Sequence, residues 1–280
     1  MANGSKVWFI TGSSKGFGHI WAEAALARGD RVAATARNTD TVKDLVDAYG
    51  DNVLAIALDV TDKAAVDAAV NRAHDHFGRL DVVVNNAGFG LFGTVEEVSE
   101  AQARAQIETN LFGALWVTKA ALPLMRAQGS GHIIQVSSIG GVNAFPLLGL
   151  YHASKWGLEG FTQSLAGEVG RFGIKVTLVE PTGYTTDWAG ASSVQASQIP
   201  AYDWVRTARE EGWANVRRGD PEATGPAILE IVDAAEPPLR IFFGDGPLEM
   251  IKAEYANRIA TWEQWNDLSV RAHGEASPEG

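Results

Sequence analysis

Three features are missing from this sequence, and each absence removes a class of function. The 280 residues include no cysteine, which excludes disulfides, thiolate-bound zinc, iron–sulfur clusters and a catalytic thiol. No apolar run approaches the ~18 residues that cross a bilayer. Residues 1–6 also lack the basic stretch and apolar segment of a signal peptide. We therefore expect a cytoplasmic protein without a membrane partner.

Cationic residues are in the minority. The formal net charge is −11, which repels polyanions, and no basic cluster stands out along the chain. We therefore expect no nucleic acid as a partner. His74 and His76 lie two residues apart on an expected helix, so they do not share a face for metal binding. We expect no metal site.

The composition is that of a globular protein with a large core. Hydrophobic residues make up 46% of the chain and charged residues 20%, and the mean hydropathy is −0.06. Short apolar runs alternate with helix-length segments. The expected strands cover residues 6–12, 31–37, 52–59, 80–86, 131–137, 174–180 and 239–244.

This alternation predicts an α/β fold with a doubly wound, seven-stranded parallel sheet and helices on both faces. We expect a single domain over residues 1–280, with ligands at the carboxyl ends of the strands. Residues 189–218 are rich in Ser and Ala, lack clear periodicity, and are expected to form a lid over the substrate. Residues 272–280 are polar and are expected to be a flexible tail.

A glycine-rich turn follows the first expected strand and opens the first helix. Residues 11–18 read Thr-Gly-Ser-Ser-Lys-Gly-Phe-Gly. Glycines at such a junction let backbone amides approach a pyrophosphate at the helix N-terminus. The alternative is an ordinary tight turn. We expect Gly12, Gly16 and Gly18 to form a phosphate site.

The end of the second expected strand bears on the choice of cofactor. An NAD enzyme normally has an acidic residue there, which accepts the ribose 2′-hydroxyl. Here the position holds Ala36, followed by Arg37, and Lys15 lies in the glycine-rich turn. Two cations and no carboxylate favour a 2′-phosphate, and therefore NADP(H). The alternative is that Arg37 only solvates the end of a strand.

Four more residues have a spacing that indicates chemistry. Tyr151 and Lys155 are four residues apart, so on a helix they share one face. Ser138 ends an expected strand thirteen residues before Tyr151, and Asn110 begins a helical Asn-Leu-Phe-Gly segment. His152 follows Tyr151, but its side chain points about 100° away on a helix, and we assign it no role in the chemistry.

Together with Asn85-Asn86-Ala87-Gly88 after the fourth strand, these motifs read TGxxxGxG, NNAG and YxxxK in order. From Lys6 to about Gly244 the chain resembles the short-chain dehydrogenase/reductase family, in particular its single-domain members of the hydroxysteroid dehydrogenase and carbonyl reductase type. The resemblance implies a Rossmann-type fold, an alcohol–carbonyl oxidoreductase, and a homodimer or homotetramer. A non-catalytic NADP(H)-binding regulatory module is the alternative.

The resemblance also assigns catalytic roles. Tyr151 would exchange the proton, and because a phenol of pKa ≈ 10 is a poor base, Lys155 and the cofactor would have to lower its pKa. Lys155 would also bind the nicotinamide ribose. Ser138 would hold the substrate oxygen. Asn110 would kink its helix and hold a water that links Lys155 to solvent.

Cofactor contacts follow from the same comparison. Asp59 matches the position that meets the adenine amino group, with a helix N-cap as its alternative. Thr182 stands where the family usually has Gly, within the segment that receives the nicotinamide carboxamide. The other implied cofactor residues are Ser14, Phe17, Val60, Asn86, Ala87, Gly88, Pro181, Gly183 and Thr186.

Apolar side chains near Tyr151 predict a pocket for a hydrophobic ketone or alcohol. The expected substrate contacts are Ser138, Phe89, Phe92, Val142, Phe145, Tyr184 and Trp188. Trp204 and Trp213 are expected either to line this pocket or to pack in the core or at a subunit contact. The helical segment from Leu248 to Arg271 is expected to cover or extend a subunit surface.

Overall fold

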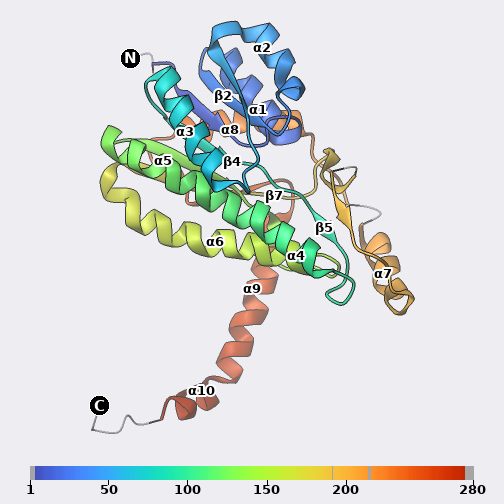
Figure 1. Cartoon of the computed structure of the whole chain (residues 1–280). Coiled ribbons are helices and arrows are strands. Elements are labelled where there is room, and N and C mark those ends of the chain that lie inside the picture. Colours follow the sequence, from blue (N-terminus) through green and yellow to red (C-terminus); the bar gives the residue numbers. More distant parts are fainter. Residues whose placement is uncertain (1–3, 191, 214–215, 275–280) are drawn as a thin grey trace. The chain divides into compact units, whose positions relative to one another are not determined.

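The computed structural model describes residues 4–190, 192–213 and 216–274 (Figure 1). The chain divides into two compact units, Met1–Gly244 and Asp245–Gly280. The second contains helices α9 (Pro247–Gln264) and α10 (Asn266–His273). All seven strands of the main sheet lie in the first unit. The expectation of one domain over residues 1–280 stays a prediction.

The main sheet has seven strands, every pair of neighbours is parallel, and their order is β3-β2-β1-β4-β6-β7-β9. The doubly wound sheet predicted from the alternation is confirmed. The order reverses between β1 and β4, where a crevice opens at the carboxyl edge of such a sheet. The strands are β1 (Val7–Ile10), β2 (Arg31–Ala36), β3 (Val53–Ala57), β4 (Val82–Asn85), β6 (Gly131–Val136), β7 (Ile174–Pro181) and β9 (Arg240–Phe243).

Helices cover both faces of the sheet (Figure 1). Residues of β1 alternate between two cores, since Trp8 packs with one cluster and Phe9 with the other. Strands buried on both faces are therefore apolar without interruption. The first face carries α1 (Gly16–Ala27), α2 (Lys43–Tyr49) and α8 (Thr224–Asp233). The second carries α3 (Lys63–Phe77), α5 (Ala114–Gln128) and α6 (Gly149–Val169).

The segment expected to be a lid contains more regular structure than its sequence pattern indicates. Strand β8 (Val194–Gln195) pairs with β5 (Leu91–Phe92), and helix α7 spans Asp203–Trp213. The Ser- and Ala-rich start of the segment hid α7, which buries none of its residues. Ala191 and residues 214–215 lie outside the described residues, as do residues 275–280 of the expected tail. The lid and the flexible tail stay predictions.

Helix α7 is tied to the loop before helix α4 (Glu100–Ile107). Arg206 donates to the Glu97 carboxylate at 2.7 Å and to the Ile199 carbonyl at 2.7 Å. The backbone N–H of Ile199 donates to the same carboxylate. The backbone N–H groups of Ile199 and Thr94, with a smaller effect from Arg206, lower the pKa of Glu97 to about 2. Within the described part of the chain, no helix has the length and apolar character to cross a bilayer.

Candidate active site

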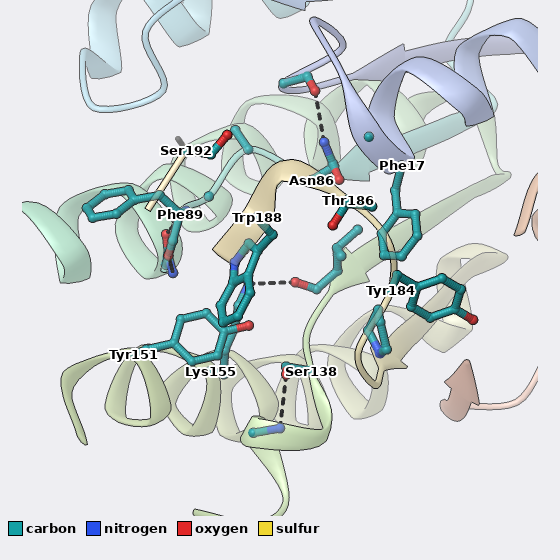
Figure 2. A pocket seen from close by; sticks show the side chains of 18 of the residues that line it. Phe17, Asn86, Phe89, Ser138, Tyr151, Lys155, Tyr184, Thr186, Trp188 and Ser192 are labelled. Atoms are coloured by element: carbon teal, nitrogen blue, oxygen red, sulfur yellow. Dashed lines mark hydrogen bonds between the residues drawn. The ribbon is translucent and has the colours of Figure 1, made fainter. Parts of the chain in front are cut away.

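A cavity of about 580 Å³ opens at the carboxyl edge of the sheet (Figure 2). Its walls come from the turn before α1, from the ends of β2, β3, β4, β6 and β7, and from α6 and α7. All four residues that were expected to be catalytic line it, as does every expected cofactor residue except Gly18. Parallel strands bring these distant motifs to one edge.

The glycine-rich turn has the conformation that its glycines allow. Gly12 and Gly16 have φ of +68° and +59°, where a side chain would be strained. A Cβ on Gly16 would meet nothing, whereas one on Gly18 would lie 2.4 Å from the Gly12 carbonyl oxygen. Gly18 therefore serves helix packing and does not line the cavity. Open space at Gly16, at the N-terminus of α1, leaves room for an anion beside free amides.

Asn86 and Thr11 fasten this turn to the end of β4. The Asn86 side-chain amide donates to the carbonyls of Thr11 and Gly12, both at 3.0 Å. The Thr11 hydroxyl accepts from the backbone N–H of Asn86 at 2.9 Å and of Ala87 at 3.0 Å. The two motifs thus form one platform, which the strand order places at the reversal point.

The end of β2 presents no acidic side chain to the cavity. β2 ends at Ala36, and the exposed Arg37 follows. Asp59 accepts from the Thr61 backbone N–H at 3.0 Å and from its hydroxyl at 2.7 Å. These bonds, with a smaller effect from Arg37, lower the pKa of Asp59. The helix N-cap is Asp62, so the capping alternative for Asp59 is wrong.

Lys15, the other cation of this region, forms an ion pair with Asp187. Both side chains are largely exposed, at 57% and 44%, so the pair adds little stability. It does join the glycine-rich turn to the segment that follows β7. An anion that binds in the cavity would compete with Asp187 for this ammonium group.

Asn110 lies inside a continuous helix rather than at the start of one. A π-helical turn, Glu108–Gly113, connects α4 to α5, which agrees with the kink that the resemblance implies. Asn110 accepts from the Phe89 N–H and donates to the Phe89 carbonyl, both at 3.0 Å, and lies 3.3 Å from the Ser154 hydroxyl. These bonds fix the loop after β4. The water that Asn110 is expected to hold stays a prediction.

Tyr151 and Lys155 lie on α6, and both are buried, with 5% and 6% of their surface exposed. The Lys155 Nζ lies 5.8 Å from the centre of the Tyr151 ring and donates to the Val136 carbonyl at 2.7 Å. An ammonium group has three donors, so two remain for a ligand. The pair has the geometry that its i, i+4 spacing predicts.

Burial sets the protonation of this pair. It raises the pKa of Tyr151 to about 12, against a lowering by the Ser138 hydrogen bond, and it lowers the pKa of Lys155 to about 8, against the charge of Glu159. Among the residues of the chain, the cost of burying a phenolate exceeds the effect of the neighbours of Tyr151, and the lowering expected from Lys155 together with the cofactor stays a prediction. At neutral pH the phenol holds its proton.

Ser138 and His152 shape the loop beside the phenol. The Ser138 hydroxyl accepts from the Gly140 N–H at 3.0 Å and also bonds to Tyr151. His152 accepts from the Phe145 N–H at its Nε2, at 2.9 Å, so its Nδ1 carries the hydrogen and donates to the Gly140 carbonyl, at 2.9 Å. His152 lines the cavity and holds this loop, a role that sequence reasoning missed.

The apolar wall differs from the expected one at two positions. Phe89, Phe145, Tyr184 and Trp188 line the cavity, but Phe92 and Val142 do not. Val142 is buried, and Phe92 packs behind Trp188 at 5.5 Å between ring centres. The Trp188 indole lies beside the Tyr151 ring at 4.9 Å (Figure 2). The cavity residues that the sequence did not indicate include Asp187, Ser192, Arg209 and Arg218.

For two Trp residues of α7, the sequence left open the pocket wall, the core and a subunit contact. Trp213 lines the cavity and packs against Phe145 at 6.0 Å, whereas Trp204 is 70% exposed. The two residues lie near opposite ends of α7, and only the structure distinguishes their surroundings. Trp213 therefore joins the wall of the site.

Thr182 occupies the usual glycine position without displacing its neighbours. Its N–H donates to the Phe243 carbonyl at 2.8 Å. Gly244 has φ +137°, and a Cβ there would lie 1.9 Å from the Thr182 hydroxyl oxygen. The absence of a side chain at Gly244 makes room for Thr182, and Pro181, Gly183 and Thr186 line the cavity as expected.

A pair of buried carboxyl groups lies near Lys155. Glu159, one turn further along α6, and Glu180, near the end of β7, are 6% and 1% exposed. Arg240 donates to Glu159 at 2.8 Å and lies 3.6 Å from Glu180. Burial and the charge of Glu159 raise the pKa of Glu180 to about 8, although Arg240 opposes this. Glu180 therefore holds a proton at neutral pH.

This proton makes stability depend on pH in a direction that can be tested. A carboxyl group whose pKa is raised by folding contributes stability fully below its ordinary pKa of 4.5 and loses it as the pH rises through about 8. Glu180→Gln stays neutral, so its free energy of unfolding should rise relative to that of the wild type between about pH 5 and about pH 9. Urea unfolding at both pH values measures this difference. The exposed Glu168→Gln is the control. A difference in unfolding free energy between Glu180→Gln and the wild type that is the same at both pH values would contradict the proton assigned to Glu180.

The reversed strand order and the cavity at that reversal define a Rossmann-type fold. A family model described as short chain dehydrogenase matches residues 6–196. Oxidoreductase BOA17 of Botryotinia fuckeliana is 42% identical over 95% of this chain and 98% of that protein. The chain therefore belongs to the short-chain dehydrogenase family of oxidoreductases.

Solved structures agree with this assignment. The crystal structure of a short-chain dehydrogenase from Streptomyces avermitilis matches with a TM-score of 0.90 and 38% identity, over 97% of this chain and 100% of that one. An alcohol dehydrogenase from the archaeon Thermococcus sibiricus, complexed with 5-hydroxy-NADP, matches with a TM-score of 0.70 and 25% identity, over 85% of this chain and 96% of that one. The similarity to the first covers nearly the whole chain.

Proposed function

We propose that this protein is an NADP(H)-dependent oxidoreductase that interconverts a hydrophobic secondary alcohol and its ketone, or an aldehyde. The observation that carries the proposal is the buried Tyr151–Lys155 pair, which opens on the same cavity as the glycine-rich turn. A proton donor and a dinucleotide site in one cavity are what carbonyl reduction requires.

The residues around the cavity fit a phosphorylated dinucleotide. Open space and free amides at Gly16 suit a pyrophosphate. Lys15 and Arg37, with Ala36 in place of an acid, suit a 2′-phosphate. The Thermococcus sibiricus relative complexed with 5-hydroxy-NADP supports the same choice. When bound, the nicotinamide supplies or accepts the hydride.

The chain's own residues would manage the proton and the oxygen. The Ser138 hydroxyl would bind the carbonyl oxygen, and the Tyr151 phenol would donate its proton as charge develops there. Lys155 would hold the ribose hydroxyls with its two free donors. The Tyr151 phenol has a pKa of about 12 and therefore holds its proton at neutral pH, the form that a proton donor needs.

A panel of ketones of graded size and polarity tests this function. NADPH consumption should be catalysed for apolar ketones and should depend on Tyr151. If NADPH fluorescence shows binding but no ketone or aldehyde is turned over, the protein is a cofactor-binding module instead. We also propose that it works in the cytoplasm as a homodimer or homotetramer, because family members assemble in this way.

Lys155 gives this proposal a second test, which needs no turnover. Its ammonium group has a pKa of about 8, so it is charged below that pH and loses its proton above it. NADPH affinity should therefore be constant up to about pH 7 and weaken severalfold by about pH 9. Titration of NADPH fluorescence at each pH measures this.

The matched variants are Lys155→Met and Lys175→Met. Lys175 also donates to a backbone carbonyl, that of Ala234 at 2.9 Å, but it does not line the cavity. Lys155→Met should bind weakly and without this pH dependence, and Lys175→Met should behave like the wild type. A pH dependence that survives in Lys155→Met would remove the ribose contact from the proposal.

A further inference from the structure

Three arginines line the cavity, Arg37, Arg209 and Arg218, and among the described residues none of them forms an ion pair; Arg37 and Arg218 are exposed. Arg209 lines the cavity from α7 and is half-buried. Its guanidinium carbon lies 4.7 Å from the centre of the Phe92 ring and 5.9 Å from that of Trp213. Among the described residues, it forms neither a hydrogen bond nor an ion pair, and the charge that acts on it is that of Glu210, the next residue along the helix.

Arg206, one turn earlier on the same helix, has hydrogen-bond acceptors for its guanidinium group. It bonds to Glu97, to Asp203 and to the Ile199 carbonyl at 2.7 to 2.8 Å. These bonds fix α7 and thereby the position of Arg209. The chain has 34 acidic residues against 23 basic ones, so an acidic partner for Arg209 would be easy to supply. The contrast indicates a guanidinium kept free for a ligand.

The position of Arg209 assigns it to the substrate rather than to the cofactor. Ring contacts run from Tyr151 to Trp188 at 4.9 Å, from Trp188 to Phe92 at 5.5 Å, and from Phe92 to Arg209 at 4.7 Å. The cations that suit a 2′-phosphate, Lys15 and Arg37, belong to the turn before α1 and the end of β2. Arg209 therefore lines the aromatic part of the cavity, and the Trp188 and Phe92 rings lie between it and the Tyr151 ring.

We propose that Arg209 binds a carboxylate on the substrate, so that the preferred substrate is an oxo acid whose carbonyl and carboxylate are separated by an apolar spacer. This inference rests on the proposed function. The apolar spacer would lie along Trp188, while the carbonyl meets Ser138 and Tyr151. A guanidinium stacked on aromatic rings keeps donors at its edge, and these match a carboxylate in pairs. Burial lowers the pKa of Arg209, and a bound anion would offset that cost of desolvation.

Pairs of substrates that differ only in charge test the proposal. Straight-chain oxo carboxylic acids of increasing length are compared with their methyl esters by following NADPH consumption. For at least one length, kcat/KM for the acid should exceed that for the ester by about tenfold or more, the size of a charge-assisted contact. In Arg209→Met, which keeps an unbranched apolar stem, this ratio should fall to about one.

The exposed Arg217, which does not line the cavity, provides the control. Arg217→Met should keep the wild-type ratio of acid to ester. An equal loss for acid and ester in Arg209→Met would show that the side chain only holds α7 in place. A weaker Kd for NADPH in that variant, with an unchanged ratio, would place Arg209 on the cofactor. Either result overturns the inference.

Failure of the proposed function gives a different result. In that case neither acids nor esters are reduced by the wild type, although NADPH binds. If esters and plain ketones are reduced but no acid is preferred, the reductase function stands and only the role of Arg209 is lost.

Discussion

Tyr151→Phe should abolish turnover and leave NADPH binding nearly intact. The substitution removes one oxygen, the proton donor, and almost no binding surface, because the ring remains packed beside Trp188. General acid catalysis contributes about 10²- to 10⁴-fold, so we expect kcat to fall by about a thousandfold. Single-turnover reduction of a ketone measures this loss, and NADPH fluorescence measures the Kd.

Two comparisons keep this result interpretable. Trp188→Phe alters the ring beside the phenol but retains the proton donor, so it should change KM more than kcat. Unfolding by urea checks that Tyr151→Phe is folded. We expect it to be, because among the described residues the buried hydroxyl bonds only to Ser138. Retention of more than about a tenth of kcat in Tyr151→Phe would mean that another group gives the proton.

The second large effect concerns cofactor choice. Ala36→Asp combined with Arg37→Ala should weaken NADPH binding by one to several orders of magnitude and should improve the use of NADH. Each charge-assisted contact to a 2′-phosphate contributes about 1.5 to 3 kcal/mol, and exposure reduces the lower end. The new carboxylate would repel the phosphate and accept the ribose 2′-hydroxyl instead.

Steady-state kcat/KM, measured with NADPH and with NADH, tests this cofactor preference. The wild type should prefer NADPH, and the double variant should lose most of that preference. Arg31→Ala is a suitable control, because Arg31 begins the same strand and packs on Phe77 at 5.4 Å, away from the cavity. Equal values for both cofactors in the wild type would show that Arg37 and Lys15 do not contact a 2′-phosphate.

Much of the fold and of the cofactor site could be predicted from the chain alone. The strands were recognisable as short apolar runs, because a parallel sheet covered on both faces needs apolar residues without interruption. The glycine-rich turn, the segment at Asn86 and the Tyr151–Lys155 pair were recognisable because each is a local pattern. Each also follows the end of a strand or lies on one helix, so the parallel order alone brings them to one edge.

The tertiary structure decided what local patterns could not. Burial, a property of the packed chain, dominates the pKa values of Tyr151 and Lys155, and the lowering of the phenol pKa by Lys155 and the cofactor stays a prediction. The pocket wall lost Phe92 and Val142 and gained Trp213 and Arg209. Side chains one or two residues apart point in different directions, and a helix that buries none of its residues cannot be placed from the pattern of the core.

The sequence by itself thus determined the sheet, the reversal point and the residues that suit a phosphorylated dinucleotide, because these depend on periodicity and on motifs of a few residues. Only the tertiary structure decided which aromatic rings surround the phenol, that burial raises its pKa, and that Arg209 reaches the cavity without an ion pair to any of the described residues. These properties depend on desolvation and on contacts between segments more than fifty residues apart, such as Arg209 with Phe92, and neither is encoded in local spacing.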